Sequence, residues 1–431
     1  MRTRTLLAVT LVFLTISAHA LPRDAPVPAS PRAYCAQAKI GLFVHYTLGT
    51  YHDGHFGGTW TGPQGKPATD LNRVADSLDV HALAALAKSM GAQYVIFTAY
   101  HAGMNMLFPS RVWGEVFPNK VARRDLVGEL ADALQAQGIP LILYVHPDDR
   151  HDLTAAEQQK LVEMGYSSQA NITEGSDRRP RDARWEALYV RLIAEIGWRY
   201  GRRLVGYWED GGLSDGPKVQ AVMLAHTPGA AIWKNGGGSG PPATLVGSED
   251  ENRKQQWAAT VAGNWWASGG KMTRTPREMY QATVLWAATQ GQVNGGIAWS
   301  AGPYLTNQWE PGVAEAFQEL GRLLRAHAPA IYGTLASTAY VTNPATNQKP
   351  EWGVATDSAD GHSVYLHVFN PPPGASLHLG KPADGSVFHR ATLLANGKAV
   401  NLTPNAQGYV LTLPKTEHWD YATVVCLSVK R

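Results

Sequence analysis

The stretch RWEALYVRLIAEIGWRYGRRLVGYWEDGG (184–212) predicts a helix followed at once by a strand. Apolar residues recur at helical spacing over 184–201, and the short apolar run LVGYW then leads into two adjacent carboxylates, Glu209 and Asp210. Two glycines follow, which predicts a turn where the strand ends. The stretch therefore places a carboxylate at a strand end, and it leaves open which of the two acids is presented.

The same alternation of helices and strands extends over residues 39–327. Helical spacing recurs at 80–92, 124–138, 276–290 and 312–327, and buried-type strands are predicted at 39–45, 93–101, 140–147, 230–235, 243–250 and 295–302. Repeated alternation implies a parallel sheet, and this many units favours a (β/α)8-like (TIM) barrel. No GxGxxG turn follows the first strand, which argues against a dinucleotide-binding fold.

The pattern changes near Tyr332. Short segments of alternating polar and apolar residues follow, with turn residues between them, as in WGVATDS (352–358) and GYVLTLP (408–414). This pattern is typical of a small all-β domain. We therefore expect the barrel to span 21–332 and a C-terminal β-sandwich to span 333–431.

The first 20 residues have the form of a secretory signal peptide. Arg2 and Arg4 precede an apolar run, and Ala18-His19-Ala20 forms a small-residue cleavage site. The run is too short to span a bilayer comfortably, and no later segment is apolar enough to do so. We expect residues 1–20 to be removed and the mature protein to be periplasmic or secreted.

Charge and tryptophan content narrow the class of binding partner, and the two cysteines raise the question of a disulfide. The net charge is only +3 with Lys and Arg scattered, so nothing indicates a nucleic-acid partner. The 14 tryptophans, several of them close to glycines and carboxylates, indicate a carbohydrate partner, although Trp also fills cores. Cys35 and Cys426 could pair in an oxidising compartment or stay as free thiols, because sequence alone gives no distance between them.

Polar and aromatic residues gather at the predicted strand ends, where the active sites of such barrels lie. No HxH, HExxH or GxSxG spacing is present, so neither a metal or other cofactor nor a serine nucleophile is expected. Two carboxylate clusters surrounded by histidines and indoles remain, which is the composition that a glycosidase needs. The strand-end residues are His45, Tyr46, Tyr100, His101, Tyr144, His146, Asp148, Trp208, Glu209, Asp210, Lys234, Asn235, Glu249, Asp250 and Glu251.

The order of these motifs resembles the α-L-fucosidases of glycoside hydrolase family 29 over nearly all of the predicted mature chain. KIGLFVHYTLGTY (39–51) is similar to the family's "KFGIFIHWG", and GYWEDGG (206–212) is similar to "LWFDG". Further similar segments, in order, are MGAQYVIFTAYHAG (90–103), RDLVGEL (124–130), LILYVHPDD (141–149), LVGSEDE (245–251), APAIYGT (328–334), WGVATDS (352–358) and VYLHVFN (364–370).

The resemblance implies a retaining, exo-acting hydrolase that releases terminal α-L-fucose from oligosaccharides or glycoconjugates. The family's nucleophile falls on Asp210, and strand alternation agrees, because Trp208 and Asp210 share a face while Glu209 points away. The acid/base falls on Glu249, with Glu251 as the runner-up and Asp250 last, since a slip of one or two residues changes the match.

Substrate-binding positions also follow from the resemblance. The implied residues are His45 and His101 for sugar hydroxyls, Tyr144 and Trp208 for the wall of the site, Trp60 on the first loop, and Lys234 as a basic residue near the nucleophile.

Three departures from the family pattern bear on the sugar. Tyr46 stands where a Trp is usual, Thr59 where a Glu is usual, and Ala102 where a second histidine is usual. If each change removes a polar contact to the glycone, preference changes strongly. Another α-L-glycoside, such as an α-L-galactoside, and a catalytically silent carbohydrate-binding protein therefore remain as alternatives. The sequence predicts nothing about linkage or oligomeric state.

Overall fold

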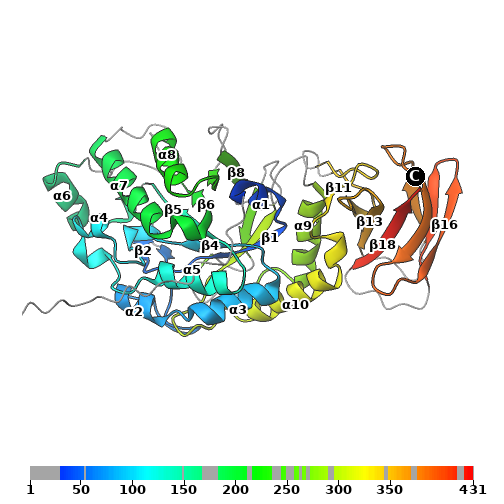
Figure 1. The fold of residues 1–431 in the computed structure, drawn as a ribbon. Helices are drawn as coiled ribbons and strands as arrows, with labels where there is room; N and C mark the ends of the chain where they lie inside the picture. Colours follow the sequence, from blue (N-terminus) through cyan, green and yellow to red (C-terminus); the bar gives the residue numbers. More distant parts are fainter. Residues whose placement is uncertain are drawn as a thin grey trace, which may run out of the picture.

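The protein is described by a computed structural model with two parts, a barrel and an all-β unit beside it (Figure 1). The predicted signal peptide and the three acid/base candidates, Glu249, Asp250 and Glu251, lie outside the described residues. The described ranges are 30–52, 55–147, 150–166, 183–210, 216–234, 244–248, 257–261, 265–267, 272–289, 296–343, 348–369, 376–414 and 422–430.

Eight parallel strands close into a barrel in the order β1-β10-β9-β8-β7-β6-β5-β4. The predicted (β/α)8-like barrel is therefore confirmed. One strand, β9, was missed by the sequence prediction. The strands are β1 (Ile40–Val44), β4 (Val95–Thr98), β5 (Leu141–Val145), β6 (Leu204–Glu209), β7 (Ala231–Lys234), β8 (Thr244–Ser248), β9 (Trp257–Val261) and β10 (Ile297–Ala301).

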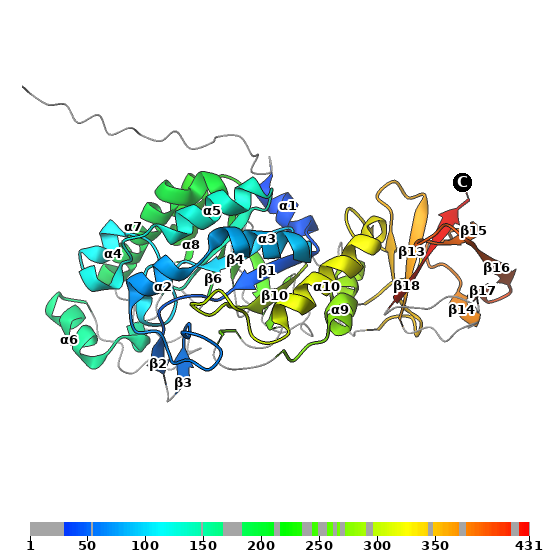
Figure 2. The same ribbon diagram turned by 90° about the horizontal axis from the view of Figure 1, so that it is seen from below.

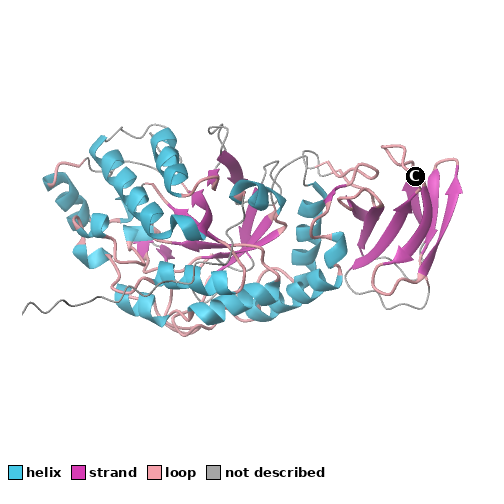
Figure 3. Cartoon of the chain, in the orientation of Figure 1, coloured by secondary structure: helices cyan, strands magenta, loops and turns pink. Residues whose placement is uncertain are grey.

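Helices surround the strands on the outside of the barrel (Figure 3). Their ends follow from local sequence: Asp79 caps α3 by accepting hydrogen bonds from the backbone N–H groups of His81 and Ala82, and Gly91 ends it with φ of 79°. Helices α3 and α10 lie side by side (Figure 2). The helices that follow β1 along the chain include α2 (Leu71–Ser77), α3 (Val80–Met90), α5 (Leu126–Ala136), α6 (Ala155–Glu163), α7 (Ala183–Tyr200), α8 (Gly216–His226), α9 (Pro276–Thr289) and α10 (Val313–Ala326).

Shorter elements complete the barrel part of the chain. Helix α1 (Pro31–Gln37) precedes β1 and packs against β6 and β7. The hairpin β2 (Thr50–His52) and β3 (His55–Gly57) follows β1. The remaining short helices are η1 (Ala102–Met104), α4 (Arg111–Gly114), η2 (Pro118–Lys120), η3 (Arg150–Asp152), η4 (Gly201–Arg203) and η5 (Ala328–Ala330).

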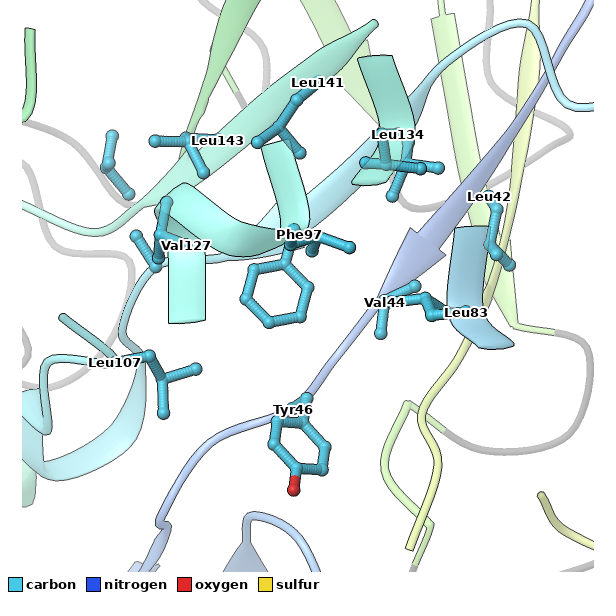
Figure 4. Close-up of a cluster of buried hydrophobic side chains, with 14 of the residues drawn as sticks. Leu42, Val44, Tyr46, Leu83, Phe97, Leu107, Val127, Leu134, Leu141 and Leu143 are labelled. Carbon is cyan, nitrogen blue, oxygen red and sulfur yellow. The ribbon is translucent and has the colours of Figure 1, made fainter. Parts of the chain in front are cut away.

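Side chains that point out from the strands form a core with the helices. Leu42 and Val44 of β1 and Phe97 of β4 meet Leu83 of α3 and Val127 of α5 in this layer (Figure 4). Burial of such side chains is the main favourable term in folding, at about 1.5–3 kcal/mol each. The outward-facing half of each strand thus fixes where the inward-facing half points.

Side chains that point inward fill the barrel and form a second cluster. Gly41 leaves room for one of them, because a Cβ there would lie 2.0 Å from Cε2 of Tyr94. The inward cluster contains Phe43, Tyr94, Ile96, Ile142, Tyr144, Val205, Trp208, Ala231, Trp233 and Ala298.

The C-terminal part is one continuous antiparallel sheet that curls around its own core. Its order is β11-β12-β13-β18-β15-β16-β17-β14, which agrees with the predicted C-terminal β-sandwich fold. The strands are β11 (Leu335–Ala336), β12 (Gly353–Asp357), β13 (Ser363–Phe369), β14 (Ser376–Gly380), β15 (Phe388–Leu393), β16 (Ala399–Asn405), β17 (Gly408–Thr412) and β18 (Ala422–Val429).

The two parts are joined through buried hydrogen bonds. The Thr356 hydroxyl donates to the Ala330 carbonyl at 2.7 Å, and Lys39 Nζ donates to the Thr334 carbonyl at 2.7 Å. Cys35 of α1 is buried against the interior cluster of the barrel, Cys426 lies in β18, and both are free thiols. Over the described part of the chain, none of the helices is long and apolar enough to cross a membrane.

Candidate active site

The site begins where β6 ends. The Asp210 N–H donates to the Val145 carbonyl of β5 at 3.0 Å, so the parallel pairing continues one residue beyond the strand. Trp208 is fully buried among the inward side chains, whereas Tyr207 belongs to the outer core and bonds the Thr227 hydroxyl at 2.8 Å. Glu209 comes two residues after Tyr207, so strand alternation places it on the same outer side. It is 2% exposed.

Asp210 is on the inward side with Trp208. The Tyr144 phenol donates a hydrogen bond of 2.8 Å to Oδ2 of Asp210, and Tyr144 itself is an inward residue of β5. Asp210 is half-buried, whereas Glu209 is 2% exposed. This geometry assigns the presented acid of GYWEDGG to Asp210 and the buried acid to Glu209.

Two histidines lie beside this carboxylate. His45 follows β1, with Nδ1 placed 3.0 Å from the Ser300 hydroxyl of β10. His101 follows β4 and stacks on Tyr144, with ring centroids 4.9 Å apart and an interplanar angle of 13°. The two imidazole centroids are 6.1 Å apart. Strands β1, β4 and β5 thus each contribute a side chain, His45, His101 and Tyr144, to the region beside Asp210.

His45 is held in its neutral form. Burial, and then the nearby His101 imidazole, lower its pKa well below the ordinary 6.5, while the Asp210 carboxylate opposes that shift. A neutral imidazole can donate one hydrogen bond and accept another, which suits a ligand made of hydroxyl groups.

Trp265 and Trp266, which the sequence prediction did not single out, complete the wall. The His45 ring lies 4.8 Å from the Trp265 ring and 5.2 Å from the Trp266 ring, and Trp266 also meets His101 edge-on at 5.4 Å. These residues follow β9, the strand that the prediction missed. The motif Asn264-Trp265-Trp266 was the available signal, since two adjacent indoles after a strand are unusual for a core.

His146 also joins the group. It was noted as a strand-end residue but was not among the predicted binding residues. Its ring centroid is 6.2 Å from that of His101, and it is 6% exposed. Trp208 lies below the group, 5.5 Å from the Phe43 ring, and forms part of its floor.

The three departures from the family pattern have different structural meanings. Tyr46 does not face the site, because its hydroxyl donates to the Val74 carbonyl of α2 at 2.7 Å within the outer core. The expectation that this change removes a contact to the sugar is therefore wrong. Thr59 is buried, and its hydroxyl accepts a hydrogen bond from the Thr47 N–H at 3.1 Å, so its oxygen serves the backbone. The side chain of Ala102 lies outside the described residues.

The other predicted residues are placed less fully. Trp60 pairs through its backbone with Pro67, and the ring contacts described above do not include it. Lys234 ends β7, where its backbone pairs in register with Glu209, and its side chain is outside the described part. Glu249 and its neighbours follow directly after β8, the strand next to β7 in the barrel.

Among the described residues, the arrangement places the half-buried Asp210 carboxylate beside imidazoles, a phenol and indole faces. Hydroxyl-rich ligands with an apolar face fit such a lining, because imidazoles bind hydroxyls and indoles stack on C–H surfaces. The family model for alpha-L-fucosidase matches residues 29–267, which is more than half of the chain. The chain belongs to the alpha-L-fucosidase family. It is therefore placed among glycoside hydrolases.

Individual members of the alpha-L-fucosidase family are distant in sequence. The putative alpha-L-fucosidase 1 of Oryza sativa subsp. japonica is 32% identical over 145 residues, which are 32% of this chain and 27% of that protein. Alpha-L-fucosidase 1 of Arabidopsis thaliana is 26% identical over 235 residues, which are 52% of this chain and 40% of that protein. The matches thus span less than half the length of these two relatives.

The fold agrees over a longer range. A GH29 alpha-L-fucosidase from Bacteroides thetaiotaomicron, trapped as a covalent intermediate with 2-fluoro-fucosyl fluoride, has a TM-score of 0.65 and 18% identity. That comparison covers 93% of this chain and 96% of the other. Both the barrel and the C-terminal sheet are therefore shared.

Proposed function

We propose that the protein is a retaining exo-glycosidase that releases terminal α-L-fucose from oligosaccharides or glycoconjugates. The observation that carries the proposal is the placement of Asp210 at the end of β6. There its carboxylate accepts a hydrogen bond from Tyr144 and lies beside His45 in a site walled by Trp265 and Trp266. Family membership supports the reaction class.

In the proposed reaction, Asp210 attacks the anomeric carbon and displaces the aglycone. Glu249, which follows β8, donates a proton to the leaving oxygen and then, as a base, activates the water that hydrolyses the glycosyl-enzyme. Glu251 is the runner-up for this role. A retaining mechanism of this kind requires the two carboxyl groups to be about 5–5.5 Å apart, and it uses no metal or organic cofactor.

The residues around Asp210 have separate parts in this proposal. Tyr144 fixes the orientation of the attacking oxygen and favours the ionised carboxylate. His45 and His101 bind hydroxyls of the glycone, and the Trp265 and Trp266 indoles contact its apolar face. Trp208, fully buried, supports the floor of the site.

A panel of aryl glycosides tests the proposal: α-L-fucoside, α-L-galactoside, α-D-galactoside and β-D-fucoside, with Asp210→Asn as the control. We expect release from the α-L-fucoside, and loss of that release in the variant by at least about 1,000-fold. Hydrolysis with inversion of the anomeric centre would contradict the retaining mechanism.

The acid/base is tested by leaving-group dependence. Glu249→Gln is expected to lose turnover of substrates with poor leaving groups while keeping the glycosylation step for activated aryl or fluoride leaving groups, which need no protonation. Glu251→Gln is the matched variant two residues away. The reverse pattern would move the role to Glu251.

A second candidate is the same chemistry on another α-L-glycoside, such as an α-L-galactoside. One observation favours it: position 59 is a Thr, which has no carboxylate, and its hydroxyl oxygen accepts a hydrogen bond from the Thr47 backbone N–H. Activity on the α-L-galactoside alone would select this candidate. Sugar binding without turnover in the wild-type protein would instead select a binding protein.

We also propose that residues 1–20 direct export and are removed. The arginines followed by an apolar run and a small-residue cleavage site support this. Sequencing of the N-terminus after expression of the full chain checks it, and a mature N-terminus near Leu21 is expected.

A further inference from the structure

One inward-facing residue near the nucleophile has no role in the proposed reaction so far. Along β5, Leu141 and Leu143 face the outer core (Figure 4), whereas Ile142 and Tyr144 belong to the interior cluster. His146 is the next residue in the inward series. It is 6% exposed, and its ring centroid lies 6.2 Å from that of His101.

Two side-chain hydrogen bonds fix the backbone at and just after His146. The Tyr100 hydroxyl donates to the His146 carbonyl at 3.1 Å, and Trp185 Nε1 donates to the carbonyl of the next residue, Pro147, at 3.1 Å. Proline restricts φ at that position as well. An imidazole on such a backbone is positioned before a ligand arrives, which lowers the entropy cost of binding.

The distance between the two rings determines what fits between them. A direct N–H···N bond would hold two imidazole centroids at most about 5 Å apart, because the nitrogen atoms would be about 2.9 Å apart. The observed 6.2 Å exceeds that limit. One oxygen that bonds a nitrogen of each ring at about 2.8 Å spans such a separation easily. A single hydroxyl group can therefore bridge the two rings at this separation.

We propose that His146 contacts the sugar, and that His146 and His101 together bind one glycone hydroxyl and make its presence a condition for efficient turnover. The inference rests on the proposed function and names a specificity residue for the same site. A neutral imidazole both donates and accepts, so the pair can satisfy both hydrogen-bonding needs of a hydroxyl. A substrate without that hydroxyl loses its hydrogen bonds to both rings, which is how such sites discriminate against analogues.

The test compares His146→Ala with wild type on an aryl α-L-fucoside and on its 2-, 3- and 4-deoxy analogues. We expect kcat/KM for the parent to fall about 10- to 100-fold. For one deoxy analogue the fall should be less than about threefold, because that analogue lacks the hydroxyl that His146 binds. His146→Gln, whose amide also donates and accepts, should recover part of the loss.

Two further variants separate contact from support. Tyr100→Phe removes the hydroxyl that holds the His146 carbonyl, and we expect a smaller loss with the same dependence on one hydroxyl. His81→Ala, on the exposed face of α3, should leave every ratio unchanged. An equal loss on the parent and on all deoxy analogues would assign His146 a purely structural role and overturn the proposal, as would no loss at all.

Failure of the proposed function gives a different result from failure of this inference. If the wild-type protein hydrolyses the fucoside but His146→Ala behaves like wild type, the inference fails and the function stands. If the wild-type protein hydrolyses nothing in the panel, binding of L-fucose and its deoxy analogues is measured by tryptophan fluorescence. Weaker L-fucose binding by His146→Ala, with no change for one deoxy sugar, would then support the contact. Equal binding by both proteins, or none by wild type, would overturn it.

Discussion

The Tyr144 phenol donates a hydrogen bond of 2.8 Å to Oδ2 of Asp210, and the same phenol ring stacks on His101 at 4.9 Å. The nucleophile proposed here is therefore oriented by a side chain from the neighbouring strand, and that side chain is held in turn by a histidine from the next strand. A hydrogen bond donated to a carboxylate favours its ionised form.

Tyr144→Phe should weaken catalysis and change its pH dependence. Loss of a hydrogen bond to a charged group costs about 1.5–3 kcal/mol, so we expect kcat/KM to fall about 10- to 150-fold. Because the bond favours the carboxylate, its removal should raise the pKa of Asp210 and move the acidic limb of the kcat/KM profile to higher pH. Tyr207→Phe, which removes a hydroxyl outside the barrel, is the control. An acidic limb that stays in place would show that the bond does not tune the nucleophile.

Substitutions of the two adjacent acids of GYWEDGG should have opposite effects, one on stability and the other on turnover. Glu209 is 2% exposed on the outward side, so Glu209→Gln should lower the free energy of unfolding by about 1–3 kcal/mol and keep kcat within about tenfold. Asp210→Asn should do the opposite, with turnover lost and the melting temperature nearly unchanged. Thermal unfolding and turnover of both variants check this. Loss of turnover in Glu209→Gln with its fold intact would reverse the assignment.

The Trp266 indole should contribute to sugar binding. Its ring meets both histidines edge-on, at 5.2 Å from His45 and 5.4 Å from His101. Trp266→Ala should raise KM at least about tenfold, whereas Trp266→Phe should retain part of the affinity because an aromatic face remains. The matched control is Trp198→Ala on α7, where the indole is 77% exposed on the outer surface. Equal KM values for Trp266→Ala and wild type would remove this indole from the binding wall.

The fold was predictable from sequence because the strands and helices differ in period and follow one another regularly. The exception, β9, shows the limit of that rule. Only residues 249–256 connect it to β8, whereas a strand–helix–strand unit needs a dozen or more connecting residues. The alternation of strands and helices therefore does not predict β9, nor does it place Trp265 and Trp266, which follow that strand, at the site.

Strand alternation predicted the side on which a strand residue points. It could not predict which partner the hydroxyl of a loop residue would bond. Trp208 and Asp210 are placed on one side by the period of two, and the structure has them so. Tyr46 and Thr59 lie in connections, where a hydroxyl can bond either the backbone or a ligand. Both bond backbone groups here, Val74 O and Thr47 N. No sequence pattern distinguishes these two outcomes.

The stability of the junction between barrel and sheet should depend on pH through His367. This residue is fully buried in β13, with Nε2 3.1 Å from the Ala330 carbonyl and 3.2 Å from the Thr356 hydroxyl. Nε2 must carry the proton to bond a carbonyl, so further protonation falls on Nδ1, which is buried and has no hydrogen-bond partner among the described residues. Burial, and then the His327 imidazole, lower the pKa of His367 from 6.5 to about 3.

The direction of the effect follows from proton binding. Between pH 6.5 and 3 the unfolded chain binds a proton at His367 and the folded chain does not, so the free energy of unfolding falls as the pH falls, by up to about 1.4 kcal/mol per pH unit. His367→Gln should remove that contribution and reduce the slope, while the contribution of His45, whose pKa is also lowered, remains. Urea unfolding between pH 5 and 6.5, above the range where most carboxylates titrate, measures it, with His378→Gln on the exposed side of β14 as the control. If His367→Gln kept the wild-type slope, another group would have to carry the pH dependence.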